Sequence, residues 1–249
     1  MSFTMQRKYL CSIPVDGLTI VQTLNKIDQS IQDRTPIHHV VINAAKVVSA
    51  QTNNELRQAI INCDIINADG QSIVWALKFL KNPIPERVAG IDLMEALIEL
   101  AGTKGYRIYF LGAEQEILNI VVNKCEAKYG HQIIAGYRNG YFTPDQEFDI
   151  AKDISESNAD ILFVAMSSPK KENFLNTYKS ILKIPFIMGV GGSFDVFAGK
   201  VKRAPLWMQN SGLEWLYRLL QEPQRMWKRY LITNTLFILL ILKEKFKSF

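Results

Sequence analysis

The sequence of 249 residues has few of the residues that build disulfide frameworks and metal clusters. Its three cysteines, Cys11, Cys63 and Cys125, have no CxxC spacing, and only two of its three histidines, His38 and His39, are close together. Adjacent side chains on a strand point to opposite faces, so this pair does not predict a metal cluster. We therefore expect no disulfide framework, no zinc site and a reducing compartment.

Long apolar runs are also missing. The start of the chain, MSFTMQRKYLCSIPVDG, lacks the apolar run of a signal peptide, so export is not expected. The stretch LITNTLFILLIL, residues 231–242, is interrupted by Thr and Asn. It falls short of the roughly 20 apolar residues that a helix needs to span a bilayer.

Three signatures of nucleotide-binding enzymes are missing as well. No Asp-x-Asp occurs, although many nucleotide-sugar enzymes use this pair to hold a metal–diphosphate complex. The glycine-rich segment GVGGSFDVFAG, residues 189–199, is not followed by a Walker lysine, which disfavours ATP hydrolysis. An acidic residue at a strand end ~20 positions further on is also absent, which disfavours a dinucleotide oxidoreductase. The glycines would still let backbone N–H groups approach a diphosphate.

Five apolar segments alternate with helical patterns and predict the fold class. They lie within residues 38–48, 63–80, 107–130, 160–182 and 185–199. The pattern predicts an α/β fold with a Rossmann-like, mainly parallel sheet and helices on both faces. Such sheets bind ligands at the carboxyl ends of their strands. The candidates directly after the expected strands are Asn43, Asp69, Gly112, Ser168 and Gly191.

Charge divides the chain into two parts. Residues 200–249 carry a net charge of +7, whereas residues 1–199 carry −2. We expect an α/β catalytic domain over 1–199 and a basic, aromatic and finally apolar helical appendage over 200–249. Its combination of apolar face, aromatic residues and cations is typical of a segment in the membrane interface. A core or dimer helix with a solvated basic edge is the alternative, and nucleic acid is not an expected partner because phosphate binding needs no apolar run.

Few single residues point to chemistry by themselves. Asp69, in the sequence NADG, lies between a strand end and a helix start, where Asp is also an ordinary turn or N-cap residue. Arg87, Lys170 and Lys171 carry charge that would neutralise phosphate, although such side chains are most often simply solvated.

Six motifs taken together are far more specific. NADG, RVAGIDL, LGA, SSPKKE, GVGGSFDVFAGKVKRAP and GLEWLYRLLQEPQRMWKRY occur in this order, from about Asn43 to Tyr230. In these motifs the chain resembles the WecG/TagA/CpsF family, glycosyltransferase family twenty-six, whose members resemble N-acetylmannosaminyltransferases. The resemblance implies an inverting transfer from a UDP-sugar to a polyprenyl-diphosphate-linked saccharide in bacterial envelope or exopolysaccharide synthesis. It further implies no essential metal or cofactor, a place on the inner face of the plasma membrane, and self-association into a homo-oligomer.

The resemblance also assigns roles to residues of this chain. Asp69 is expected to be the catalytic base. The expected donor-binding residues are Asn43, Arg87, Gly112, Lys171, Gly191, Gly192 and Asp195, and those for the acceptor diphosphate are Arg218, Arg225 and Arg229.

Two positions depart from the family pattern. Many relatives have Gln in the place of Lys171, and Thr in the place of Val41, two residues before the Asn. The donor sugar therefore stays open among an N-acetylmannosamine-like sugar, a uronic acid and a hexose. A catalytically inactive membrane-associated scaffold and a nucleotide-dependent oxidoreductase are the alternative functions.

Overall fold

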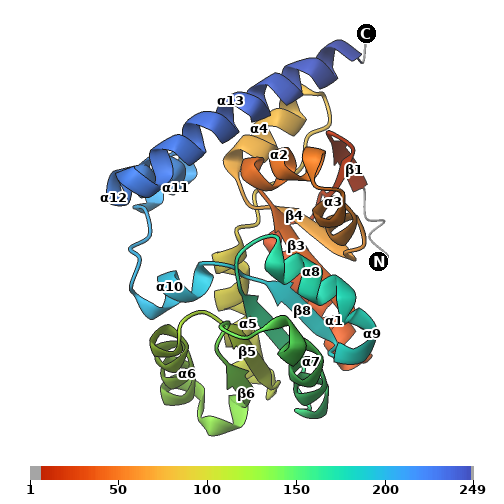
Figure 1. Ribbon diagram of the computed structural model, residues 1–249, viewed down its shortest axis with the longest axis vertical. Coiled ribbons are helices and arrows are strands. Elements are labelled where there is room, and N and C mark those ends of the chain that lie inside the picture. The colour runs from red at the N-terminus through yellow and green to blue at the C-terminus, as the bar shows by residue number, and fades with distance from the viewer. Residues whose placement is uncertain (1–6, 248–249) are drawn as a thin grey trace.

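A six-stranded parallel sheet forms the centre of the molecule (Figure 1). The computed structural model describes residues 7–247, apart from the side chains of Arg225, Arg229 and Lys247. The strands follow the order β4-β3-β8-β7-β5-β6, and each neighbouring pair is parallel. Their bounds are β3 Ile37–Ile42, β4 Ile65–Ala68, β5 Ile108–Gly112, β6 Ile134–Arg138, β7 Ile161–Ala165 and β8 Phe186–Gly189. The predicted α/β fold with a mainly parallel sheet is confirmed.

Helices cover both faces of this sheet because both faces of its strands are apolar. Alternation along the strands sends Phe110 and Phe163 into one cluster and Leu111 and Val164 into another. The first face is covered by α1 Ile20–Gln32, α5 Gly90–Lys104, α6 Gln115–Tyr129 and α10 Ser193–Ala198. The second face carries α2 Ala44–Thr52, α3 Asn54–Ile61, α4 Gln71–Phe79, α7 Glu147–Glu156, α8 Lys170–Thr177 and α9 Lys179–Leu182. Two short 3-10 turns, η1 His131–Ile133 and η2 Pro144–Gln146, complete this part.

Three of the strands, β1 Arg7–Leu10, β2 Ile13–Asp16 and β6, lie outside the five segments from which the sheet was predicted. Strand β6 lies at the edge of the sheet, and its residues are only half-buried or exposed, so it lacks the continuous apolar run of the inner strands. An antiparallel hairpin of β1 and β2 precedes the sheet. The buried carboxylate of Asp16 holds the hairpin in place, because it pairs with Arg7 at 2.8 Å and accepts a hydrogen bond from the Ile66 N–H at 2.8 Å.

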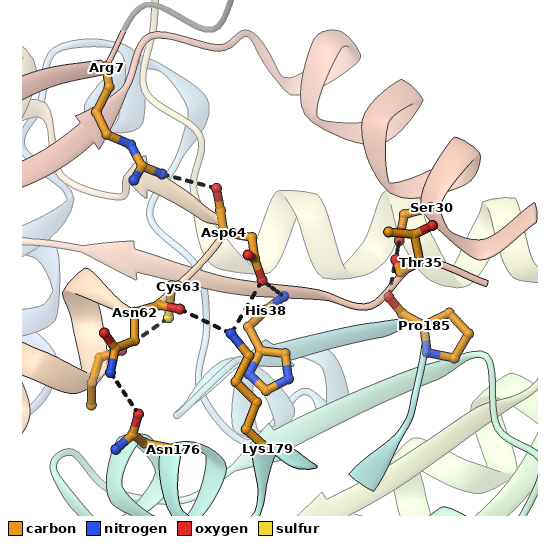
Figure 2. Close-up of polar contacts among 11 residues, drawn as sticks. Arg7, Ser30, Thr35, His38, Asn62, Cys63, Asp64, Asn176, Lys179 and Pro185 are labelled. Atoms are coloured by element: carbon orange, nitrogen blue, oxygen red, sulfur yellow. Dashed lines mark hydrogen bonds and ion pairs between the residues drawn. The ribbon is translucent and has the colours of Figure 1, made fainter. Parts of the chain in front are cut away.

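Structural hydrogen bonds close the amino edge of the sheet (Figure 2). Asp64, just before β4, accepts from the His38 N–H at 2.8 Å, and its backbone oxygen accepts from Arg7 at 3.0 Å. Farther along the same edge, the Ser30 hydroxyl donates to the Pro185 carbonyl at 3.0 Å. Sheets of this kind bind ligands at the opposite, carboxyl edge.

The C-terminal segment consists of α11 Leu206–Asn210, α12 Glu214–Gln221 and α13 Pro223–Lys247. Helix α13 runs along α2 and past α4 (Figure 1), and its side chains Phe237 and Ile241 are buried in the cluster of the hairpin, α2 and α4. The Glu244 carboxylate accepts a hydrogen bond from the Cys11 N–H at 2.5 Å. The second half of α13 is thus packed into the core.

Other apolar side chains of α13 face outward. Trp227, Leu231, Ile232, Leu236, Ile238, Leu239, Leu242 and Phe246 are exposed. Among the helices of residues 7–247, none is long and apolar enough to cross a membrane.

Replacing Phe237 by Ala tests whether α13 is an integral part of the core. Phe237 is 5% exposed, whereas Leu239 on the same helix is 57% exposed. We expect Phe237→Ala to lower the free energy of unfolding by about 3 kcal/mol, because it leaves a cavity. Leu239→Ala should change it by less than about 0.5 kcal/mol. Urea unfolding followed by circular dichroism measures both, and equal effects would contradict the packing of α13.

Candidate functional site

Asp69 lies directly after β4, at the carboxyl edge of the sheet. Its backbone N–H donates to the Ile42 carbonyl of β3 at 2.9 Å, which fixes the turn. Its Oδ1 accepts a hydrogen bond from the Gly90 N–H at 3.0 Å, at the first residue of α5. The amino end of a helix stabilises negative charge, so α5 supports the carboxylate form.

The surroundings of Asp69 adjust its pKa to a value useful for proton transfer. Desolvation by burial raises the pKa of Asp69 from 3.8 to about 6, while the Gly90 N–H and the charge of Arg87 act in the opposite direction. Glu214 raises the pKa further, and Lys46 lowers it. A general base works best with a pKa near the operating pH, so this carboxylate has the property that the role requires.

Asn43 lies beside the turn that carries Asp69. The side chain of Asn43 caps α2 and accepts a hydrogen bond from the Lys46 N–H at 3.1 Å. A Cβ atom placed on Gly70 would be 3.7 Å from the Asn43 Cβ. The oxygen of the Asn43 side chain thus has a structural partner, and Asn43 lies beside Asp69 at the carboxyl edge of the sheet.

Three buried charges form a chain between α2 and α8. The Glu172 carboxylate lies 2.9 Å from the Lys46 ammonium and 3.0 Å from the Lys171 ammonium, and all three side chains are less than a tenth exposed. Desolvation and the nearby Lys46 lower the pKa of Lys171 to about 8, although Glu172 raises it. Burial alone would raise the pKa of Glu172, but the two lysines outweigh it and lower the pKa to about 2. Two ammonium groups and one carboxylate carry a formal net charge of +1.

The glycine-rich loop lies against Lys171. A Cβ atom on Gly189 would approach the Lys171 side chain to 3.0 Å, and one on Gly191 would be 4.0 Å from its Nζ. Gly191 has φ +55°, in the left-handed region that favours glycine. A Cβ on Gly192 would lie 3.6 Å from a guanidinium nitrogen of Arg218 and 3.9 Å from an Asp195 oxygen. The loop therefore brings residues expected to bind the donor sugar nucleotide close to Arg218, which is expected to bind the acceptor diphosphate.

Arg87 pairs with a residue of the C-terminal segment. Its guanidinium lies 2.6 Å from the carboxylate of Glu214, the first residue of α12. Arg203 approaches the other oxygen of Glu214 at 3.7 Å and also pairs with Asp92 on α5. Among the described residues, no hydrogen-bond partner is present for the buried Nε and Nη2 atoms of Arg203 or for Nε of Arg218.

Gly112 lies at a different place along the same edge. It has φ +122°, and a Cβ there would meet the Ala165 carbonyl oxygen at 2.4 Å, so β5 and β7 approach closely at this point. Next to it is an open pocket of about 580 Å³, whose lining includes Ala113, Phe142 and Lys170. Helices α6 and α8, which follow β5 and β7, pack on opposite faces, and this is where α/β sheets form crevices. Gly112 is four strands from Asp69, roughly 19 Å at the usual spacing.

The structure thus gathers most of the sequence candidates into one region. Asn43, Asp69, Arg87, Lys171, Gly191, Gly192, Asp195 and Arg218 are connected through the contacts above. Gly112 stands apart, beside the pocket. Arg225 and Arg229 belong to α13, but their side chains lie outside the described residues.

Four residues of this region were not predicted, namely Lys46, Glu172, Arg203 and Glu214. Each takes its place through an ion pair with a residue far away in the sequence, as Arg87 and Glu214 do at a separation of 127 positions. Three of them, Glu172, Arg203 and Glu214, occur inside the motifs SSPKKE, KVKRAP and GLEW, which is the signal that points to them.

The region around Asp69 combines groups that suit an anionic ligand. A carboxylate, several cations and a glycine-rich loop meet at the carboxyl edge of a parallel sheet. The model of the glycosyl transferase WecG/TagA/CpsF family matches residues 8–249, so the chain belongs to that family. It is a glycosyltransferase of cell wall polysaccharide synthesis.

Replacing Asp69 by Asn should stabilise the protein at neutral pH. The folded state raises the pKa of Asp69 to about 6, so it favours the protonated carboxyl and loses stability as pH rises from about 4 to 6. Asn is neutral at every pH and keeps an oxygen for the Gly90 N–H. We expect a gain of about 1–2 kcal/mol at pH 7.5 and almost none at pH 4, from urea unfolding at both values. A loss of stability at pH 7.5 would contradict the raised pKa.

Proposed function

We propose that this chain transfers a sugar from a UDP-sugar to a polyprenyl-diphosphate-linked saccharide, with inversion and without a metal ion. The observation that carries the proposal is the Asp69 carboxylate, with a pKa near 6, bound to the first N–H of α5 and surrounded by cations. Family membership supports transferase chemistry over the oxidoreductase alternative.

Asp69 acts as the general base in this mechanism. It accepts the proton of the acceptor hydroxyl, whose oxygen forms a bond to the anomeric carbon. The bond from that carbon to the UDP oxygen breaks on the opposite side and leaves its electron pair on UDP. A positioned base contributes about 100-fold or more to such a step.

The donor lies along the carboxyl edge. The pocket beside Gly112 takes the nucleoside, the glycine-rich loop and Lys171 take the diphosphate, and the sugar points toward Asn43 and Asp69. The separation between the pocket and Asp69 supports this order, because an extended nucleotide sugar has its base and its sugar at opposite ends. Backbone amides and the Lys171 ammonium, together with Arg87, stabilise the leaving charge in place of a metal.

The C-terminal segment, residues 200–249, binds the acceptor. Arg218 lies over the glycine-rich loop, and we assign it, with Arg225 and Arg229, to the acceptor diphosphate. The exposed apolar residues of α13, together with its cations, support contact with the inner face of the membrane, where the acceptor lipid resides. We also expect the protein to act as a homo-oligomer.

Asp69→Asn tests the transferase mechanism directly. We expect acceptor-dependent UDP release to fall at least 100-fold, while release by the wild type persists in EDTA. The assay uses a panel of UDP-sugars with a short polyprenyl-diphosphate-N-acetylglucosamine acceptor. Glu99→Gln, an exposed charge loss on α5, is the control and should retain activity. Absence of release with every donor, together with a normal cellular role for Asp69→Asn, would favour an inactive scaffold.

Lys171→Gln tests how the donor is recognised. The pKa of Lys171 near 8 predicts that kcat/KM of the wild type declines above pH 8, as the ammonium loses its proton. The variant should lack this decline and have a kcat/KM reduced about tenfold at pH 7 with every UDP-sugar, because all share the diphosphate. Lys152→Gln, on the exposed surface of α7, is the matched control. A loss confined to a uronic acid donor would show that Lys171 binds a sugar carboxylate instead.

A further inference from the structure

Glu214 connects the C-terminal segment to the surroundings of Asp69. It is the first residue of α12, and its two oxygens face Arg87 at 2.6 Å and Arg203 at 3.7 Å. The side chain of Arg87 is only 16% exposed and that of Glu214 is 35% exposed, so solvent screens this pair only in part. A carboxylate from the appendage thus neutralises a cation of the α/β domain next to the proposed base.

The same contacts hold the start of α5. Arg87 precedes Gly90 by three residues, and the Gly90 N–H is the one that binds Asp69. Arg203 pairs with both Glu214 and Asp92, in the first turn of α5. Glu214 therefore restrains, through two arginines, the backbone that supports Asp69.

Glu214 also acts on the charge of Asp69, in the direction opposite to the nearby cations. Arg87 and Lys46 favour the charged form of Asp69, and so does the attraction between Asp69 and Lys171, whereas Glu214 opposes it. The hydrogen bond from Gly90 also favours the charged form. Without Glu214, three cations would face Asp69 with no opposing carboxylate from α12.

We propose that Glu214 is a positioning residue, which orients Arg87 and the start of α5 and thereby sets the surroundings of the Asp69 carboxylate. This inference rests on the proposed function, since that function makes Asp69 the base.

The test is a measurement of the Asp69 pKa itself. Full-length protein with carbon-13 in the aspartate carboxyl groups is titrated by NMR from pH 4 to pH 9, and Asp69→Asn identifies the Asp69 resonance. In Glu214→Gln we expect the pKa to fall from about 6 by roughly half a unit or more, since loss of the negative charge and a freed Arg87 act in the same direction. Glu99→Gln should leave it unchanged, and unaltered resonances of the other aspartates report an intact fold.

Three further variants extend the test, and two of them, Arg87→Gln and Glu214→Asp, keep a carboxylate at position 214 and so cover the case in which Glu214→Gln does not fold. Arg87→Gln should raise the pKa of Asp69, and the double variant Arg87→Gln/Glu214→Gln should bring it back toward the wild-type value, while Glu214→Asp should keep it near 6. An Asp69 pKa that is the same in wild type, Glu214→Gln and Arg87→Gln would overturn the inference.

Activity measurements separate this inference from the proposed function. The acid limb of the kcat/KM profile for UDP release should move to lower pH in Glu214→Gln together with the NMR value. If the Asp69 pKa measured by NMR shifts in Glu214→Gln but the protein has no transferase activity, the link between Glu214 and Asp69 stands and the proposed function is refuted. If Glu214→Gln is an active transferase whose kcat/KM profile and Asp69 pKa are both unchanged, only the link between Glu214 and Asp69 is refuted.

Discussion

Buried charge at the carboxyl edge of the sheet is the constraint on which the rest of the site depends. An ion removed from water costs several kcal/mol unless another charge faces it, so each charge here fixes the position of a partner. The buried charges of Lys46 and Lys171 are stabilised by the Glu172 carboxylate that lies between them. The charge of Arg87 is stabilised by Glu214 on α12. These pairs join α2 to α8 and the sheet to the C-terminal segment, which explains why segments far apart in the sequence meet at Asp69.

The C-terminal segment is attached near both of its ends. Glu214 at the start of α12 pairs with Arg87, and Glu244 near the end of α13 accepts from the backbone of Cys11. Phe237 and Ile241 add apolar burial at the second of these contacts, whereas the apolar side chains facing outward remain exposed. Charge thus anchors the end near the proposed site, and core packing anchors the other. We propose that the exposed side chains contact the membrane in this docked position.

The sequence predicted the sheet, and it placed the candidate residues at one edge of it, because both depend on local patterns. Continuous apolar runs mark five of the six strands, and the polar residues that follow them, such as Asn43 and Asp69, necessarily share the carboxyl edge. Strand β6 was missed because it is partly exposed and has no such run, whereas the other edge strand, β4, is fully buried. Lys46 and Glu214 were missed because a surface lysine or glutamate looks the same in the sequence as one that neutralises a distant charge. Separating the two requires the long-range contacts that only the fold provides.

The two departures from the family pattern have different consequences in the structure. Val41 packs toward the start of α5, where one of its methyl groups would lie 3.4 Å from a Cβ on Gly90, and it belongs to the core cluster of the first face. An alkyl group there affects the support of Asp69 and brings no charge. Lys171 adds a cation that Glu172 cannot balance, because Glu172 already faces Lys46.

The positive charge of Lys171 needs an anionic partner on the donor. The Lys171 ammonium lies against Gly189 and Gly191, in the loop that we assign to the diphosphate. Every UDP-sugar carries that anion, so the excess charge is matched without a carboxylate on the sugar. The position of Lys171 therefore favours a diphosphate contact and removes the need to infer a uronic acid donor from this substitution.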